Sequence, residues 1–252
     1  MDNAALTQLQ HKLAHYQLSP QAVEVVRGTP IVLLVGISGA GKDTIKHRLL
    51  EEKAQAYHHI VSHTTRAPRR NHDIMEQDGV EYHFIDIKTA EAMVDSRAFI
   101  EAKIYSNNMY GTSVAEIRLA HDEGKIAITD LEVQGVEEYV KISPQAHPIF
   151  ILPPNYDVWR HRLLARYGSK LQDYRADLQK RMQTAREELR HALSVDYFYF
   201  VINNNLQQAV AEVDRLAHQP QDVAKQNVQS RAVAEQLLAQ ISAHLDGDAS
   251  LR

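Results

Sequence analysis

Short apolar runs rich in β-branched residues recur along the chain, and segments with helical patterns separate them. The runs are Ile31–Val35, Ile60–Val61, Ile126–Thr129, Ile149–Leu152 and Phe198–Ile202. Strands that alternate with helices and are apolar on both faces are typical of a parallel sheet covered by helices on both sides. The pattern therefore predicts an α/β protein with a parallel core sheet.

Both ends of the chain carry helical patterns outside this core. In residues 1–28, a stripe of leucines precedes Ser19-Pro20, a pair typical of a helix start, and Gly28 is typical of a helix end. Residues 222–246 show another apolar helical pattern. Three interpretations stay open: these helices pack on the core, on each other, or on another subunit of a homo-oligomer.

One segment between the core strands has a different character. Residues 63–112 are polar and rich in loop formers, and they contain two strand-like runs, Tyr82–Ile85 and Phe99–Ile104. This pattern indicates an insertion rather than part of the core sheet. Directly after it, Ser113-Val114-Ala115-Glu116 has the form of a capping box, which predicts a helix that ends near Gly124.

The first core strand leads into a phosphate-binding sequence. Gly36-Ile37-Ser38-Gly39-Ala40-Gly41-Lys42 matches Gly-x-x-x-x-Gly-Lys between a strand and a helix. Glycines let backbone N–H groups face a polyphosphate, the helix N-terminus adds positive charge, and the lysine reaches the outer phosphates. The expected triphosphate contacts are Ser38, Gly39, Ala40, Gly41, Lys42, Asp43 and Thr44. Asp43 stands where Ser or Thr usually binds Mg²⁺, so Asp43 and Thr44 are both candidate metal ligands.

Composition narrows the class of protein. The 252 residues have a net charge of −4 and no cysteine, which excludes disulfides, thiolate metal sites and cysteine nucleophiles. No basic field indicates nucleic acid, no apolar run approaches the roughly 20 residues of a membrane span, and the N-terminus lacks a secretory pattern. We therefore expect a cytoplasmic protein. The histidines, including His11, His15 and His58-His59, are interpreted as solvated surface residues.

A second phosphate site is predicted one helix and one strand after the first. Ser62-His63-Thr64-Thr65-Arg66-Ala67-Pro68-Arg69 places two arginines three residues apart around a proline. The planar guanidinium donates paired hydrogen bonds to phosphate oxygens. Beside a triphosphate loop, this pair indicates the acceptor of a phosphoryl transfer, although a solvated basic loop has the same sequence pattern.

Several segments, in order and with consistent spacing over residues 30–215, together resemble the guanylate kinase family. They are Gly36–Thr44, Ser62–Arg69 leading into Glu76–Phe84, Phe99–Glu101 leading into Asn108–Ser113, Ile128–Gly135, Leu152–Pro154, Arg162–Arg166, Arg181-Met182 and Asp196–Asn203. The resemblance implies a three-layer P-loop core with a parallel five-stranded sheet, an inserted nucleoside-monophosphate-binding part and a helical lid. It also implies an Mg²⁺-dependent enzyme that takes ATP and GMP.

The resemblance implies roles for individual residues. On the acceptor side, the expected GMP contacts are Ser62, Arg66, Arg69, Tyr82, Glu101, Tyr110, Thr112, Asp130 and Glu132. Glu101 matches the carboxylate that recognises guanine, which presents N1–H and N2–H donors that adenine lacks. On the donor side, Asn203 matches a contact near the adenine of ATP. The expected catalytic cations are Lys42, Arg66, Arg162, Arg166 and Arg181, the last three from a lid in the helical, arginine-rich segment 155–193.

The expected organisation is an N-terminal helical extension over 1–28, a guanylate-kinase-like domain over 29–220 with its insertion near 63–112 and its lid near 166–181, and a C-terminal helical extension over 221–252. Two alternatives stay open. Gly-Lys-Asp at the phosphate loop also occurs in ribose 1,5-bisphosphate phosphokinases, which resemble guanylate kinases. A guanylate-kinase-like interaction module without catalysis is the third hypothesis, against which stand the retained Lys42, Arg66 and Arg69.

Overall fold

The structure is a computed structural model that describes residues 3–71, 74–165, 174–218 and 227–249. The chain divides into two compact units. Unit 1 comprises Met1–Ile31, Gln55–Thr129 and Glu137–Ala146, and unit 2 comprises Val32–Ala54, Asp130–Val136 and His147–Arg252. No helix among the described residues has the length and apolar character needed to cross a membrane.

The predicted core strands form one five-stranded sheet with the order β11-β10-β1-β9-β2. The strands are β1 (Ile31–Val35), β2 (Tyr57–His59), β9 (Ile126–Asp130), β10 (Ala146–Leu152) and β11 (Tyr199–Ile202). The pairs β10–β11 and β2–β9 both run parallel. All five residues of β1 are buried, as expected for a strand covered on both faces. The predicted α/β class with a five-stranded sheet is confirmed.

The second core strand lies earlier than its apolar residues suggest. The sequence places it at Ile60–Val61, but β2 ends at His59. Ile60 still donates its backbone N–H to the carbonyl of Ile128, at 3.0 Å. The N–H of Val61 instead donates to a side chain, the carboxylate of Glu116, at 2.9 Å. Because a side chain takes this donor, the ladder stops and the chain leaves the sheet.

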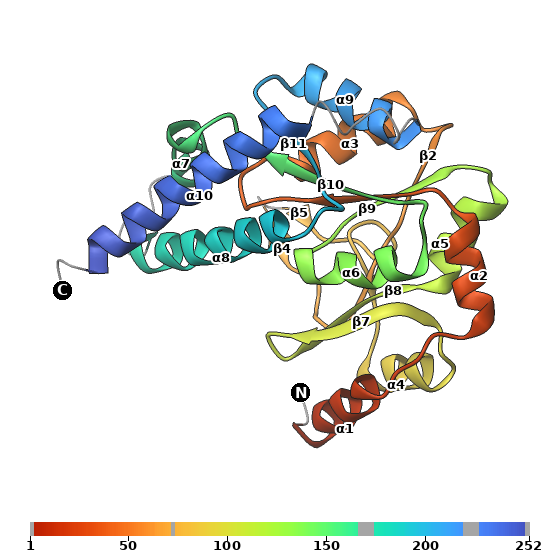
Figure 1. Ribbon diagram of the computed structural model, residues 1–252. Helices are drawn as coiled ribbons and strands as arrows, with labels where there is room; N and C mark the ends of the chain where they lie inside the picture. Colours follow the sequence, from red (N-terminus) through yellow and green to blue (C-terminus); the bar gives the residue numbers. More distant parts are fainter. Residues whose placement is uncertain (1–2, 72–73, 166–173, 219–226, 250–252) are drawn as a thin grey trace. The chain divides into compact units, whose positions relative to one another are not determined.

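The C-terminal helix packs on other elements of unit 2. The helices of this unit are α3 (Lys42–Glu52), α7 (Tyr156–Ala165), α8 (Tyr174–Ser194), α9 (Leu206–His218) and α10 (Asn227–Ala249). Helix α10 runs alongside α8 and also contacts β11 and α7 (Figure 1). Its apolar face, which includes Leu237, Ile241 and Leu245, is buried. Of the interpretations left open, packing on the core holds for this helix.

Unit 1 contains a separate four-stranded sheet with the order β6-β3-β8-β7. Its strands are β3 (His63–Thr64), β6 (His83–Phe84), β7 (Phe99–Tyr105) and β8 (Asn108–Ser113), and a short ladder joins β4 (Arg70–Asn71) to β5 (Ile74–Met75). Strand β3 pairs in parallel with β6 and antiparallel with β8. The polar segment thus builds its own sheet, with the helix α4 (Ile87–Asp95), which the sequence pattern did not predict.

The N-terminal extension forms α1 (Asn3–Ala14) and α2 (Pro20–Gly28). Ser19 caps α2 by accepting the N–H of Ala22 at 3.1 Å, as its sequence predicts. Helix α1 packs on α4 and β7, and the fully buried Leu9 joins Ala90 and Phe99 in one apolar cluster. The N-terminal helix therefore supports the small sheet of unit 1.

The remaining helices are α5 (Val114–Asp122) and α6 (Val133–Ile142). Ser113 caps α5 as predicted, because its hydroxyl accepts the N–H of Glu116 at 3.4 Å. The predicted return contact of the capping box, in which the Glu116 side chain would accept the backbone N–H of Ser113, is wrong. The Glu116 side chain contacts Val61 and His83 instead of returning to the start of its own helix.

Candidate active site

The loop between β1 and α3 has the backbone of a phosphate-binding loop. Gly36 and Gly41 have φ angles of 145° and 96°, which favour glycine. A side chain at Gly36 would collide with the backbone of Ile151, and one at Gly41 would collide with the amide of Asn203. The loop keeps its shape because these two positions carry no side chain.

The polar residues that end this loop lie where a polyphosphate would be held. Lys42 begins α3, and its Nζ donates to the carbonyl of Gly36 at 3.0 Å. Asp43 and Thr44 lie exposed on the first turn of α3. Carboxylate and hydroxyl oxygens suit Mg²⁺, which usually keeps several waters and phosphate oxygens as its other ligands. Both residues could bind a Mg²⁺ ion that also binds the oxygens of a bound triphosphate.

Three side chains predicted from the sequence converge on the loop within unit 2. Arg181 donates to Oγ of Ser38 at 3.1 Å, and Nδ2 of Asn203 donates to the carbonyl of Ala40 at 2.8 Å. Arg162 in turn donates to the carbonyl of Asn203 at 3.0 Å. Of the arginines predicted to form a lid, Arg181 therefore contacts the phosphate loop directly, and Arg162 contacts Asn203, which bonds to the loop. Arg166 lies outside the described residues.

A group of carboxylates also belongs to unit 2. Asp130, at the end of β9, forms an ion pair with Lys46 of α3, while Glu132 is exposed. Burial raises the pKa of Glu188 on α8 to about 7, Lys42 acts in the opposite direction, and Glu132 adds to the rise. Glu188 therefore stands near the phosphate-loop lysine, and nothing in its sequence pattern indicated this.

In unit 1, Arg66 is held in a fixed orientation. Its two terminal nitrogens donate to the two carboxylate oxygens of Glu76, at 2.8 and 3.1 Å, and both side chains are 8% exposed. Its guanidinium carbon lies 5.3 Å from the ring centre of Tyr82 and 5.7 Å from that of Phe84. Oxygen Oε2 of Glu76 also accepts the backbone N–H of Arg69 at 2.7 Å. Glu76 thus ties both arginines of the predicted acceptor site together.

The other predicted phosphate contacts surround this pair. Tyr82 and Tyr110 meet edge to face, with ring centres 5.9 Å apart. Tyr110 pairs with Thr64 across β8 and β3, just before Arg66. The backbone carbonyl of Ser62 accepts the N–H of His83, which follows Tyr82, at 2.9 Å. Tertiary structure therefore gathers the residues predicted to contact the acceptor phosphate in unit 1 from three separate segments.

The predicted base-recognition pair is also formed in unit 1. Glu101 and Thr112 are register partners on β7 and β8, and the Thr112 hydroxyl donates to Oε1 of Glu101 at 3.0 Å. Burial raises the pKa of Glu101 to about 7. Tyr139 is fully buried, and its pKa is raised by burial and further by the charge of Glu101.

The histidines differ in their exposure, and not all of them are the solvated surface residues that the sequence suggested. His11 and His15 are exposed, with ring centres 5.1 Å apart. For His58 the interpretation is wrong, because its side chain is 17% exposed and its Nδ1 lies 3.4 Å from Oε2 of Glu123. Across the described part of the chain, no group of three or more His, Asp or Glu residues is arranged to hold a metal ion.

Sequence reasoning did not assign roles to Glu76, Glu188 and Tyr139, although Glu76 lies in a segment that carries the family resemblance. Glu76 lies ten residues after Arg66, and no periodic pattern predicts their bidentate contact. Glu188 is one of two adjacent glutamates on an arginine-rich helix, and only packing singles it out. Tyr139 looks like an ordinary apolar position of α6.

Comparison with known proteins identifies relatives of this chain. The family model described as guanylate kinase matches residues 27–219. Guanylate kinase of Mannheimia succiniciproducens is 35% identical over 212 residues, which are 83% of this chain and 97% of that protein. Guanylate kinase 1 of Arabidopsis thaliana is 36% identical over 195 residues, 76% of this chain but 48% of that protein. The chain thus spans about half the length of its plant relatives.

The crystal structure of guanylate kinase from Anaplasma phagocytophilum has a similar fold. Its TM-score is 0.57 with 21% sequence identity, and the match covers 82% of this chain and 94% of that one. At this identity the likeness supports the fold alone. The family model covers most of the chain, and the bacterial relatives agree with it over most of their own length. The chain belongs to the guanylate kinase family.

Proposed function

We propose that this chain transfers the γ-phosphoryl group of ATP to GMP and produces ADP and GDP, with Mg²⁺ as the metal. The observation that carries the proposal is the pair formed by Glu101 and Thr112 in the unit that also holds Arg66, Tyr82 and Tyr110. A partly buried carboxylate suits guanine, which offers two adjacent donors. The phosphate group of the same nucleotide suits the arginine and the tyrosines.

In this reaction an oxygen of the GMP phosphate attacks the γ-phosphorus, and the bond to the β,γ-bridging oxygen breaks, so ADP leaves. The attacking oxygen is already ionised near neutral pH, so no general base is needed. Catalysis then consists of positioning and of stabilising charge on the phosphoryl oxygens. Lys42, Arg162 and Arg181 supply positive charge around the phosphate loop, and Arg166 is proposed as a further lid cation.

Mg²⁺ supplies charge neutralisation on the phosphate oxygens when it is bound with ATP. We propose that Asp43 or Thr44 holds it, since both oxygens are exposed at the start of α3. On the nucleotide side, Asp130 and Glu132 remain proposed GMP contacts, although both belong to unit 2. The domain boundaries expected from the sequence are likewise proposals.

Asp43 favours one alternative acceptor. Gly-Lys-Asp in the phosphate loop also fits a kinase for ribose 1,5-bisphosphate, a sugar phosphate without a base. Against it stands the base-recognition pair, for which a sugar phosphate has no use.

A coupled ADP-release assay with ATP and Mg²⁺ tests the proposal. The acceptors are GMP, dGMP, AMP, UMP and ribose 1,5-bisphosphate, and Lys42→Ala is the control that removes activity carried by this chain. We expect turnover with GMP and its loss in the control. Turnover with the sugar bisphosphate but not with GMP would replace the proposal with the alternative, and no turnover with any acceptor would favour a non-catalytic module.

A further inference from the structure

A buried carboxylate outside the expected substrate contacts joins two segments of the acceptor site. Glu116 lies on the first turn of α5, and its side chain is 11% exposed. We propose that Glu116 is a positioning residue that sets the places of Ser62 and Tyr82, two expected contacts of the acceptor phosphate. This inference rests on the proposed function for its effect on GMP, but its structural part can be measured without substrate.

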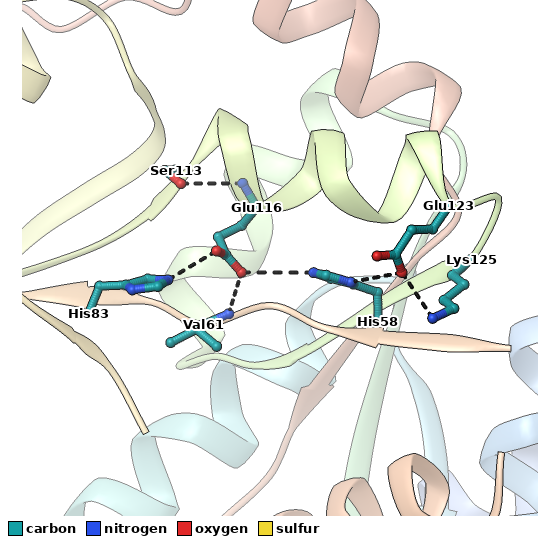
Figure 2. Close-up of polar contacts among 7 residues, drawn as sticks. All are labelled: His58, Val61, His83, Ser113, Glu116, Glu123 and Lys125. Atoms are coloured by element: carbon teal, nitrogen blue, oxygen red, sulfur yellow. Dashed lines mark hydrogen bonds and ion pairs between the residues drawn. The ribbon is translucent and has the colours of Figure 1, made fainter. Parts of the chain in front are cut away.

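The Glu116 side chain contacts Val61 and His83, the chain neighbours of Ser62 and Tyr82 (Figure 2). Oε2 accepts the backbone N–H of Val61, the residue before Ser62, at 2.9 Å. Oε1 lies 3.0 Å from Nε2 of His83, the residue after Tyr82. An ionised carboxylate only accepts hydrogen bonds, so the imidazole nitrogen is the donor. Glu116 therefore holds both segments: it binds the first through the backbone of Val61 and the second through the side chain of His83.

The two segments also touch each other where the carboxylate holds them. The backbone N–H of His83 donates to the carbonyl of Ser62 at 2.9 Å, and β3 and β6 pair in parallel from His63 and His83 onward. This junction is only two residue pairs long, so backbone pairing alone constrains it weakly. The Glu116 carboxylate adds two charge-assisted hydrogen bonds, which are stronger than neutral ones.

Further polar side chains lie around the Glu116 carboxylate. Nε2 of His58 lies 4.0 Å from Oε2, and Nδ1 of the same ring lies 3.4 Å from Glu123, which Lys125 contacts at 2.9 Å (Figure 2). A buried carboxylate is costly to desolvate unless hydrogen bonds satisfy it. Since Ser113 already caps α5 through the backbone N–H of Glu116, the helix start does not require this carboxylate.

Three variants separate positioning from general stability. Glu116→Ala removes both contacts, whereas Glu116→Gln keeps an oxygen that can accept the N–H of Val61. Glu123→Gln is the matched control, because it removes charge from the same network without touching Val61 or His83. We expect Glu116→Ala to raise KM for GMP about tenfold or more and to leave KM for ATP unchanged, with a smaller rise for Glu116→Gln and none for Glu123→Gln.

Amide hydrogen exchange of the substrate-free protein supplies the second measurement. We expect Glu116→Ala to speed exchange at Val61, Ser62, Tyr82 and His83, and Glu123→Gln to leave these rates unchanged. Unchanged exchange at the four amides in Glu116→Ala would overturn the positioning role, whatever the substrate. If exchange changes as expected but the wild-type protein does not phosphorylate GMP, the proposed function fails and the positioning of these segments stands. Equal increases of KM for GMP and ATP would instead indicate a general loss of structure.

Discussion

At the scale of single residues, two glutamates of unit 1 have pKa values shifted in opposite directions. Burial raises the pKa of Glu101 to about 7, whereas the hydrogen bonds from Arg66 lower the pKa of Glu76 below its usual value. Desolvation disfavours the charged carboxylate, and a guanidinium partner favours it. The sequence shows two glutamates, and their different surroundings give them different tasks.

As the proposed reader of guanine, Glu101 is expected to make the use of GMP depend on pH. Its two oxygens both act as acceptors for guanine only when the carboxyl is ionised, and with a pKa of about 7 the protonated form dominates below pH 7 in the free protein. We therefore expect KM for GMP to rise about tenfold between pH 8 and pH 6, as a pKa near 7 requires. Glu101→Gln should lower the preference for GMP over AMP and remove this part of the pH dependence.

The measurement is a pH profile of kcat/KM for GMP and AMP in both proteins. The phosphate of the nucleotide has its own pKa near 6, and the Glu101→Gln profile shows that contribution alone. Parallel profiles for the two proteins, with the same ratio of kcat/KM for GMP and AMP, would contradict the role of Glu101.

Glu76 should contribute to folding stability above its usual pKa. Its pKa is lowered in the folded protein, so the contribution is complete above the unfolded value and is lost as pH falls through the lowered folded value. Glu76→Gln should reduce the free energy of unfolding by about 2 kcal/mol at pH 7. Urea denaturation at pH 7 and near pH 3 measures the difference between the two proteins, which should shrink at the acid pH. A difference that is the same at both pH values would count against an ionic contact with Arg66.

At the scale of elements, the terminal helices are parts of the two units to which they belong. Helix α1 contributes Leu9 to the apolar cluster with Phe99, and the hydroxyl of Tyr16 accepts the N–H of Phe99 at 2.9 Å. Phe99 begins β7, the strand that carries Glu101. The N-terminal extension thus supports the strand that carries Glu101.

The buried face of α10 should be needed for the stability of unit 2. Leu237 is 1% exposed where α10 packs along α8 and β11, while the neighbouring Gln236 is exposed. Leu237→Ala should reduce the free energy of unfolding by about 3 kcal/mol, and Gln236→Ala should change it by less than about 0.5 kcal/mol. Chemical denaturation measures both variants. Equal effects would mean that α10 does not pack as described.

At the scale of the whole molecule, most of the expected donor and acceptor contacts lie in different units. The phosphate loop, Arg162, Arg181 and Asn203 belong to unit 2, whereas Arg66, Glu101 and Thr112 belong to unit 1. Two expected GMP contacts, Asp130 and Glu132, are exceptions, because they belong to unit 2. A ligand that binds the folded state suppresses local opening around its site.

Each substrate alone should therefore protect the segments that carry most of its expected contacts. We expect GMP to slow amide hydrogen exchange around residues 62–66 and 99–112, and an ATP analogue with Mg²⁺ to slow it around residues 36–46. Hydrogen exchange with each ligand separately provides the measurement, and the unliganded protein is the reference. If GMP protected only residues 36–46, the assignment of the acceptor site to unit 1 would be wrong.

The sequence by itself determined the α/β class, four of the five core strands, the phosphate loop and both terminal helices. Strand alternation, glycine spacing and helix caps are local signals, so residues near one another in the chain carry them. Order and spacing also predicted which residues contact the acceptor phosphate, and these roles stay predictions, while how the residues meet was not predictable from the chain.

Only the tertiary structure decided which residues contact across the sequence. It showed that Glu116 leaves its predicted capping role for Val61 and His83, that Glu76 ties Arg66 to Arg69, and that α10 packs along α8. It also showed that the pKa of Glu101 is raised and that of Glu76 is lowered. Each of these outcomes depends on burial and on partners distant in sequence, and no local pattern of hydrophobic and polar residues encodes them.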